Sequence, residues 1–194
     1  MSTNEARLLQ ILQNRSFKRG EFRLASGDVS TYYIDGKMSE VYSEAAHLIG
    51  EVLYDRTKEL EVVAIGGLEV GAVPLTTAAV ISYFHHGREM EGFWVRDSVK
   101  SHGTQKRIEG GLKRGSRVVI VDDVITRGTS AAKAVDAALD FDCEIVLVLS
   151  LVDRLQGARE LFQSKGINCY ESIFTIRDFG VEADVREPAQ VIAR

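Results

Sequence analysis

The apolar positions of the chain form short continuous runs separated by longer segments with helical spacing. Runs of this kind are Val62–Ile65, Val118–Val121 and Ile145–Val152. Continuous apolar runs of four to eight residues are typical of strands that are buried on both faces, as in parallel sheets. Because a helical segment separates each run from the next, the pattern predicts an α/β fold with an open, mostly parallel sheet flanked by helices.

The intervening segments carry the stop and start signals of helices. Pro74 falls in the first turn of one of them, where its missing N–H is harmless, and Gly166 stops another. Helices are predicted near residues 8–12, 43–60, 74–84, 131–139 and 155–165, and further strands at 92–95, 117–121 and 173–176. We therefore expect a single domain over residues 1–194, with its core at about 43–180.

Two extended runs around the turn Ser26-Gly27-Asp28 lie near the N-terminus, between Phe22 and Asp35. Extended runs joined by a short turn of this composition predict a β-hairpin. We expect the hairpin to form a small N-terminal subdomain over about residues 17–40, before the main sheet begins. Residues 182–194 show no pattern.

Composition narrows the class of protein. The 194 residues are 45% hydrophobic and 27% charged, with a formal net charge of -4. These values are typical of a globular protein, and the acidic balance argues against a nucleic-acid-binding surface as the main function. The longest uncharged run, Val70 to His86, contains Pro74 and is shorter than the ~20 apolar residues that span a bilayer. No signal peptide is apparent, and only two cysteines are present, so we expect a cytoplasmic protein without membrane contact or disulfide framework.

The segment from Arg117 to Ser130 carries the clearest chemical signal. A strand leads into Asp122 and Asp123, then into a turn with Gly128 and three hydroxyl side chains, and then into a helix. Backbone N–H groups and the dipole at a helix N-terminus favour a phosphate. Two carboxylates repel a phosphate unless they bind hydroxyls or a metal of the same ligand, and a ribose 5-phosphate meets both conditions. The alternative is an ordinary acidic turn with Ser130 as the helix N-cap.

Three other segments carry residues that could bind a ligand at the same edge of the predicted sheet. Gly66–Gly71 contains three glycines after a strand, which suggests backbone conformations unavailable to other residues and amides exposed to an anion; a plain tight turn is the alternative. Arg96–Arg107 is a polar, cationic loop, for which a solvated surface loop is the alternative. Arg154 follows a strand at the end where ligands of α/β sheets bind, although it could simply pair with Asp153.

The stretch around Asp122 and Asp123 resembles the phosphoribosyl pyrophosphate (PRPP) signature of the type I phosphoribosyltransferases. That resemblance implies that the two acids hold the ribose 2- and 3-hydroxyls and that the following turn cradles the 5-phosphate. The residues it assigns to PRPP are Asp122, Asp123, Val124, Ile125, Thr126, Arg127, Gly128, Thr129 and Ser130, together with Arg96, Lys100 and His102.

Three further stretches resemble the orotate phosphoribosyltransferases within that class. Leu24 to Tyr32 is similar to their "L-x-S-G-x-x-S-x-Y" hairpin, a hood over the base. Arg96 to Gly103 is similar to their "R-K-x-x-K-x-H-G" loop, and Asp153 to Gly157 to "D-R-x-x-G". The resemblance implies that Tyr33 and Ile34 lie near the pyrimidine, with Lys37 close behind. Ala25 and Asp97 stand where many relatives have lysines.

By this resemblance, Arg96, Lys100 and His102 are catalytic, and Thr126 and Arg154 orient orotate through its carboxylate. The resemblance also implies Mg²⁺, held mainly through PRPP and water rather than by direct protein ligands. A homodimer is implied as well, in which the loop of one subunit, residues 96–107, completes the site of its neighbour.

The expected activity is transfer of the 5-phosphoribosyl group from PRPP to orotate, giving orotidine 5-monophosphate and pyrophosphate. One alternative is a phosphoribosyltransferase for another base. A second is a PRPP-sensing regulator without catalysis, which Asp97 favours slightly because an acid beside pyrophosphate repels it. A third is a generic phosphate-binding, receiver-like domain, which does not account for the loop from Arg96 to Gly103 and for Arg154 together.

Overall fold

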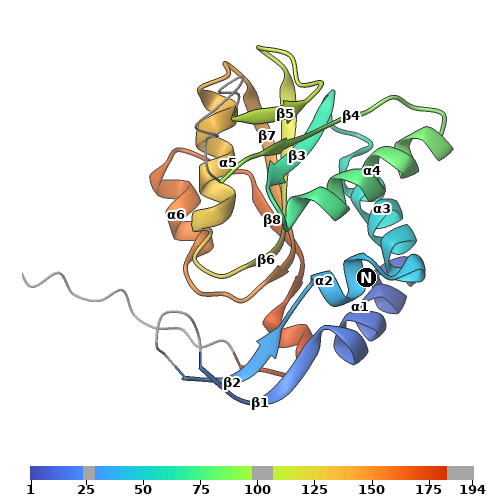
Figure 1. Cartoon of the computed structure of the whole chain (residues 1–194), viewed down its shortest axis with the longest axis vertical. Helices are drawn as coiled ribbons and strands as arrows, with labels where there is room; N and C mark the ends of the chain where they lie inside the picture. Colours follow the sequence, from blue (N-terminus) through green and yellow to red (C-terminus); the bar gives the residue numbers. More distant parts are fainter. Residues whose placement is uncertain (24–28, 98–106, 183–194) are drawn as a thin grey trace, which may run out of the picture.

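A six-stranded sheet forms the centre of the computed structural model, which describes residues 1–23, 29–97 and 107–182 (Figure 1). The strand order is β5-β4-β3-β6-β7-β8, and only β5 runs antiparallel to its neighbour. The strands are β3 (Ala64–Leu68), β4 (Glu91–Val95), β5 (Ile108–Gly110), β6 (Arg117–Ile125), β7 (Glu144–Asp153) and β8 (Tyr170–Thr175). The predicted open, mostly parallel sheet is confirmed.

Helices cover both faces of this sheet, as the alternation within β6 requires. Val119 and Val121 belong to one hydrophobic cluster with α3 (Ser43–Thr57) and α4 (Ala72–His85). Val118 and Ile120 belong to a second cluster with α5 (Thr129–Leu139) and α6 (Ala158–Ser164), on the opposite side in Figure 1. Successive strand residues point to opposite faces, so a continuous apolar run is stable only in this two-sided arrangement.

The N-terminal segment consists of α1 (Thr3–Arg15), β1 (Phe17–Arg23), β2 (Val29–Ile34) and α2 (Lys37–Glu40). Strands β1 and β2 pair antiparallel, which confirms the predicted hairpin, whereas α2 and β5 were not predicted. Tyr32 and Ile34 of β2 are buried in the same cluster as α3 and α4. Arg19 donates hydrogen bonds to the carbonyls of Phe179 and Gly180 at the end of the 3₁₀ helix η1 (Ile176–Phe179), so the hairpin is held to the end of the sheet.

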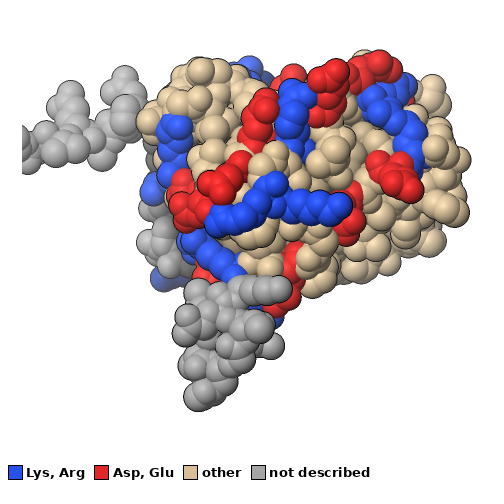
Figure 2. Space-filling view, turned by 90° about the horizontal axis from the view of Figure 1, so that it is seen from above, with Lys and Arg blue, Asp and Glu red and all other residues tan. Residues whose placement is uncertain are grey.

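Charged side chains of both signs are interspersed on the face seen from the top of Figure 1 (Figure 2). Ion pairs at the amino end of β6 have the same mixed character: Arg117 pairs with Glu61 and Glu144, and Arg114 pairs with Asp142. Mixed pairs of this kind at the surface contribute little to stability but keep the field of either sign small. None of the helices within the described ranges is long and apolar enough to cross a membrane.

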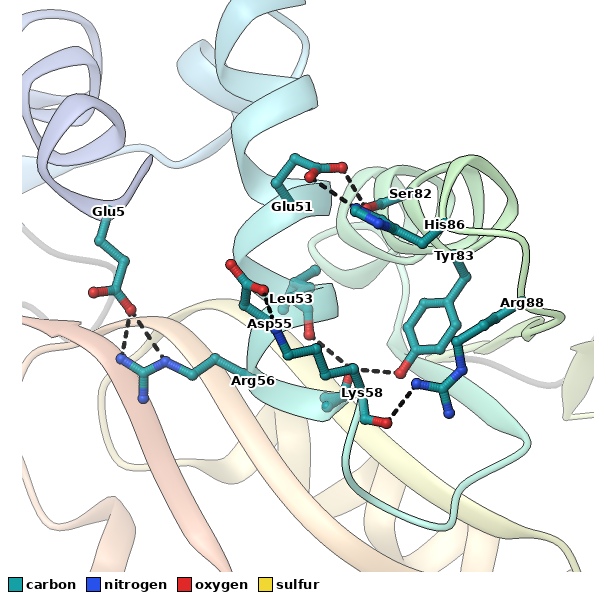
Figure 3. Close-up of polar contacts among 11 residues, drawn as sticks. Glu5, Glu51, Leu53, Asp55, Arg56, Lys58, Ser82, Tyr83, His86 and Arg88 are labelled. Carbon is teal, nitrogen blue, oxygen red and sulfur yellow. Dashed lines mark hydrogen bonds and ion pairs between the residues drawn. The ribbon is translucent and has the colours of Figure 1, made fainter. Parts of the chain in front are cut away.

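Polar contacts join α1, α3 and α4 (Figure 3). Arg56 of α3 contacts Glu5 of α1 at 2.7 Å, and Glu51 accepts a hydrogen bond from Ser82 of α4 at 2.6 Å. The buried Thr57 hydroxyl donates to the carbonyl of Leu53 and lies 2.9 Å from the hydroxyl of Tyr83. These contacts fix how α1, α3 and α4 pack against one another.

Two predicted strand ends were wrong, and pairing with neighbouring strands explains both. Strand β6 continues to Ile125 because β7 pairs with it as far as Asp153, so Asp122 and Asp123 lie inside the strand rather than in a loop. Strand β3 covers Ala64–Leu68 rather than 62–65, so Gly66 and Gly67 lie in the sheet. A side chain at either glycine would collide with the backbone of a neighbouring strand, which accounts for glycine at both positions.

Two helix starts were also misplaced. Helix α5 begins at Thr129 with Gly128 as its N-cap, in a left-handed conformation at φ 80°, so Ser130 is not the cap. Helix α6 begins at Ala158 rather than near 155, because Leu155 has φ 57° and Gly157 has φ 100°. Positive φ is incompatible with an α-helix, so the chain turns there before the helix starts.

Candidate active site

The carboxyl ends of β3, β6 and β7 bring the predicted site residues together. Asp122 and Asp123 lie near the end of β6, Arg154 follows β7, and Gly71 follows β3 at the start of α4. In open α/β sheets this edge is where ligands bind. The short helix α2 reaches the same edge and places Lys37 against Asp123.

The two aspartates are buried and have different contacts. The Oδ1 atom of Asp122 accepts a hydrogen bond from the backbone N–H of Asp123 at 3.1 Å. The Nζ atom of Lys37 donates to Oδ2 of Asp123, also at 3.1 Å. A side chain at Gly71 would collide with Oδ1 of Asp123 and lie 3.2 Å from Oδ1 of Asp122. Glycine is therefore required where the start of α4 passes the carboxylates.

The glycines of segment 66–71 are explained by close packing and not by the predicted backbone conformation. None of Gly66, Gly67 and Gly71 has a positive φ, so unusual backbone conformation is not the reason for these glycines. Their role is to allow close approach, to neighbouring strands and to Asp123 respectively. The Glu69–Val70 peptide bond after β3 is cis.

Buried carboxyl groups dominate the electrostatics at this edge of the sheet. Burial raises the pKa of Asp122, and the charge of Asp123 raises it further. Burial, with the charge of Asp123, also raises the pKa of Glu40 to about 8. For Lys37, burial lowers the pKa, but the charge and hydrogen bond of Asp123 more than offset this, so its pKa is raised. Sequence reasoning missed Glu40 because it lies in a short polar segment without any recognised pattern.

The turn before α5 has the features that suit a phosphate. Gly128 precedes the helix, and the hydroxyls of Thr126, Thr129 and Ser130 form no hydrogen bond with any other described residue. Thr129, Ser130 and Arg127 are exposed, and they surround the positive end of the α5 dipole. The adjoining Val124 and Ile125, which were also predicted to bind PRPP, direct their side chains into the two hydrophobic clusters. Only their backbone atoms could therefore contact a ligand.

Arg154 is buried and is held by Tyr32 rather than by Asp153. Its Nε atom donates to the hydroxyl of Tyr32 at 3.0 Å, and its Cζ atom lies 4.6 Å from the centre of that ring. The carboxylate of Asp153 instead accepts the backbone N–H of Leu155 at 2.7 Å. Within the described part of the chain, the two terminal nitrogens of Arg154 form no hydrogen bond, so they are available to a carboxylate.

The hairpin residue that contacts Arg154 is Tyr32, next to Tyr33 and Ile34, whose proximity to the pyrimidine stays a prediction. Ile34 is buried in the core, and Tyr33 is 42% exposed with its ring 5.5 Å from that of Phe22. Neighbouring strand residues point to opposite faces, so Tyr33 cannot share the environment of Tyr32. The sequence pattern could have indicated Tyr32, since it alternates with the buried Ile34.

The cationic loop 96–107 joins β4 to β5, and its two ends are described by the structure. The backbone N–H of Arg96 donates to the carbonyl of Arg107 at 2.9 Å, and the guanidinium of Arg96 lies 3.5 Å from Glu109. Asp97 pairs with Lys133 on α5, where both side chains are largely exposed. Asp97 therefore pairs with a residue of α5 and not with the residues around Asp122 and Asp123. The other two predicted catalytic residues, Lys100 and His102, lie outside the described residues.

Comparison with known proteins agrees with this geometry. The phosphoribosyl transferase domain family matches residues 37–183. An orotate phosphoribosyltransferase of Rhodopirellula baltica is 40% identical over 91% of this chain and 94% of its own length. The crystal structure of the Mycobacterium tuberculosis orotate phosphoribosyltransferase with Fe(III) dicitrate superposes with a TM-score of 0.80 at 36% identity, covering 92% of this chain and 99% of that one.

A second structure of the Mycobacterium tuberculosis protein is a complex with PRPP, and it superposes with a TM-score of 0.76 at 33% identity, covering 92% of this chain and 99% of that one. The family match covers most of the chain, and the relatives align over nearly their full length. The chain therefore belongs to the phosphoribosyltransferase family, within its orotate phosphoribosyltransferase group.

Proposed function

We propose that this protein transfers the 5-phosphoribosyl group from PRPP to orotate, giving orotidine 5-monophosphate and pyrophosphate. The observation that carries the proposal is the arrangement at the carboxyl edge of the sheet. There the buried pair Asp122 and Asp123 lies on the strand that leads into the turn before α5, and Arg154 follows the neighbouring strand, with terminal nitrogens that form no hydrogen bond among the described residues.

For PRPP, the carboxylates of Asp122 and Asp123 would accept hydrogen bonds from the ribose 2- and 3-hydroxyls. The N–H groups and hydroxyls from Thr126 to Ser130 would hold the 5-phosphate. The superposition with a relative that was crystallised with PRPP supports this assignment.

For orotate, Arg154 supplies the recognition. A guanidinium can bind a carboxylate through two parallel hydrogen bonds, and its contact with Tyr32 fixes the plane in which it does so. Thr126 lies at the end of β6 and would complete the orientation of the base.

Cleavage of the bond to pyrophosphate leaves positive charge on the ribose and negative charge on the leaving group. Arg96, Lys100 and His102 would stabilise that negative charge, and closure of the loop would exclude water from the oxocarbenium-like sugar. The oxygen donors of the site suit a hard cation. When bound with PRPP, mainly through the substrate and water, Mg²⁺ would add positive charge at the pyrophosphate.

We further propose a homodimer in which loop 96–107 completes the neighbouring site, and a cytoplasmic location. Cys143 and Cys169 are both free thiols, as is usual for a reducing compartment. The acid at position 97 was the feature that favoured a regulator without catalysis. Because Asp97 pairs with Lys133, it would not repel pyrophosphate, so this feature no longer favours a regulator.

The proposal is tested by following orotate absorbance after addition of PRPP and Mg²⁺, with adenine and uracil as competing acceptors in parallel. Loss of orotate that depends on PRPP is the expected result. Consumption of another base instead would show a different specificity, and PRPP binding without turnover of any base would point to a regulator.

A further inference from the structure

Glu40 is a buried carboxyl group for which the proposed reaction has assigned no role. It is 3% exposed and lies at the end of α2, next to the PRPP carboxylates. Neither of its carboxylate oxygens has a hydrogen-bond donor among the described residues. A buried ionised carboxylate without a donor is costly, so the position needs a physical explanation.

The neighbour of Glu40 is another acceptor, the carboxylate of Asp123. Both groups face the α-carbon of Gly36: a side chain there would collide with Oε1 of Glu40 and lie 3.1 Å from Oδ2 of Asp123. Two carboxylates can share a hydrogen bond only if one of them carries a proton. Lys37 already donates to Oδ2 of Asp123, whereas no described residue donates to Glu40, so we assign the shared proton to Glu40.

We propose that Glu40 is a positioning residue, which in its protonated form donates a hydrogen bond to Asp123 and fixes that carboxylate for the ribose hydroxyls. This inference rests on the proposed function, because Asp123 is the ribose ligand only if PRPP is the substrate. Lys37 and Glu40 hold Asp123 from the α2 side, and Oδ1 remains turned toward Asp122 and Gly71.

The charged groups that face Glu40 determine when this arrangement fails. They are Asp35 and Lys37 from its own segment and Asp123 from β6, with Asp122 next to Asp123. The end of α1 also contacts this segment: the hydroxyl of Ser16 lies 2.6 Å from that of Ser39, and Nε of Arg15 donates to the carbonyl of Met38 at 3.3 Å. Once Glu40 loses its proton, Lys37 is the cation among the described residues that opposes the charges of these carboxylates. Asp123 is then repelled, and the affinity for PRPP falls.

The test measures KM for PRPP and kcat from pH 6.5 to 9.5 in the wild-type enzyme and in Glu40→Gln and Glu40→Leu. The Gln amide can still donate to Asp123 but does not titrate. At pH 7 we expect a KM within about twofold of wild type for Glu40→Gln and about tenfold higher for Glu40→Leu, the size of one lost hydrogen bond. Above pH 8 the wild-type KM should rise and that of Glu40→Gln should not.

Glu44→Gln is the matched control, because Glu44 lies four residues along the chain at the start of α3 and pairs at the surface with Arg7. Its pH profile should follow that of the wild type. An unchanged KM in Glu40→Leu, or the same rise above pH 8 in Glu40→Gln as in the wild type, would overturn the role of Glu40. If the wild-type enzyme does not consume orotate with PRPP, the proposed function itself fails, which is a different result.

Infrared difference spectra between the wild type and Glu40→Gln provide a readout that does not depend on turnover. We expect the carbonyl stretch of a protonated carboxylic acid in the wild type at pH 7 and its loss at pH 9.5. Absence of that band at pH 7, in variants that remain folded by circular dichroism, would show that Glu40 is ionised and would contradict the inference.

Discussion

Tyr32 and Arg154 are far apart in the sequence, and their contact links the N-terminal hairpin to the end of β7. The hydrogen bond and the ring contact act on the same guanidinium, so its orientation is fixed before any ligand binds. A group that is already oriented loses less conformational entropy when it binds a planar carboxylate. At the scale of single residues, we therefore expect Tyr32 to affect the binding of orotate and not that of PRPP.

Tyr32→Phe keeps the ring but removes the hydroxyl that accepts from Nε of Arg154. We expect KM for orotate to rise about tenfold, the effect of one hydrogen bond to a charged group, with KM for PRPP unchanged. Steady-state kinetics with each substrate varied in turn measures both constants. Tyr33→Phe is the control, since Tyr33 packs on Phe22 and should leave both constants unchanged. Equal changes in both constants for Tyr32→Phe would show a general structural effect instead.

Glu40 also links stability to pH. Its pKa is raised from 4.5 to about 8, mainly by burial, so between these values the native state holds a proton that the unfolded chain has released. The unfolded state then binds fewer protons, and the wild-type free energy of unfolding falls as pH rises from about 4.5 to 8. Glu40→Gln lacks this loss, so its free energy of unfolding should gain on the order of 5 kcal/mol relative to wild type across that range.

Urea unfolding at several pH values between 5 and 8.5 measures this difference. In the control Glu44→Gln, the difference in free energy of unfolding from wild type should stay constant over this pH range. The hydrogen bond from Arg7 lowers the pKa of Glu44, so Glu44 titrates below the range. A difference for Glu40→Gln that does not grow with pH would mean that Glu40 is ionised in the native protein.

At the scale of elements, one buried hydroxyl pair contributes to the contact between α3 and α4. Thr57 has a single hydroxyl hydrogen, which it donates to the carbonyl of Leu53. The hydroxyl of Tyr83, 2.9 Å away, must therefore be the donor to Thr57. Both side chains are almost completely buried, so no water replaces a lost partner.

Tyr83→Phe should lower the free energy of unfolding by about 1 kcal/mol, because it leaves an acceptor lone pair of Thr57 unsatisfied. Enzyme activity should not change, since the Thr57–Tyr83 pair lies away from Asp122 and Asp123. Chemical denaturation with a shared m-value measures the effect. Tyr54→Phe is the control on the same helix pair: its ring packs edge-on against Tyr83, but its hydroxyl forms no hydrogen bond among the described residues. An equal loss in both variants would assign the effect to packing.

At the scale of the whole molecule, the cations predicted to stabilise the leaving group all belong to loop 96–107. Of these, Arg96 lies near Glu109, and Lys100 and His102 lie outside the described residues. In the proposed dimer this loop serves the neighbouring site. A closed symmetric dimer contains two such sites, each built from both subunits.

Subunit mixing tests the shared site. Lys100→Ala and Asp123→Ala should each lower turnover more than tenfold, which is about 1.4 kcal/mol. If each site uses the loop of its partner, random exchange of equal amounts should restore about a quarter of wild-type activity, because half of the dimers contain one intact site. Exchange is verified with differently tagged subunits. No recovery after verified exchange would show that each loop serves its own subunit.

The sequence by itself determined the order of buried strands, the parallel sheet and the residue types at its carboxyl edge. Apolar runs such as Val118–Val121 and spacings such as Asp122-Asp123 to Gly128 are local, and local periodicity fixes them to within a few residues. The family resemblance of these short segments, later confirmed by the match over residues 37–183, rests on the same local order.

Only the tertiary structure decided which distant side chains meet. It placed Tyr32 rather than Tyr33 under Arg154, turned Asp97 toward Lys133, and set Glu40 and Lys37 against Asp123. The alternation of Tyr32 with Ile34 indicates which face of the hairpin is buried, but no periodic signal predicts the partners in these contacts, because each contact joins segments that are separated in the chain. The charge state of Glu40 has the same origin: burial and the approach of Asp123 set it, and both are consequences of packing.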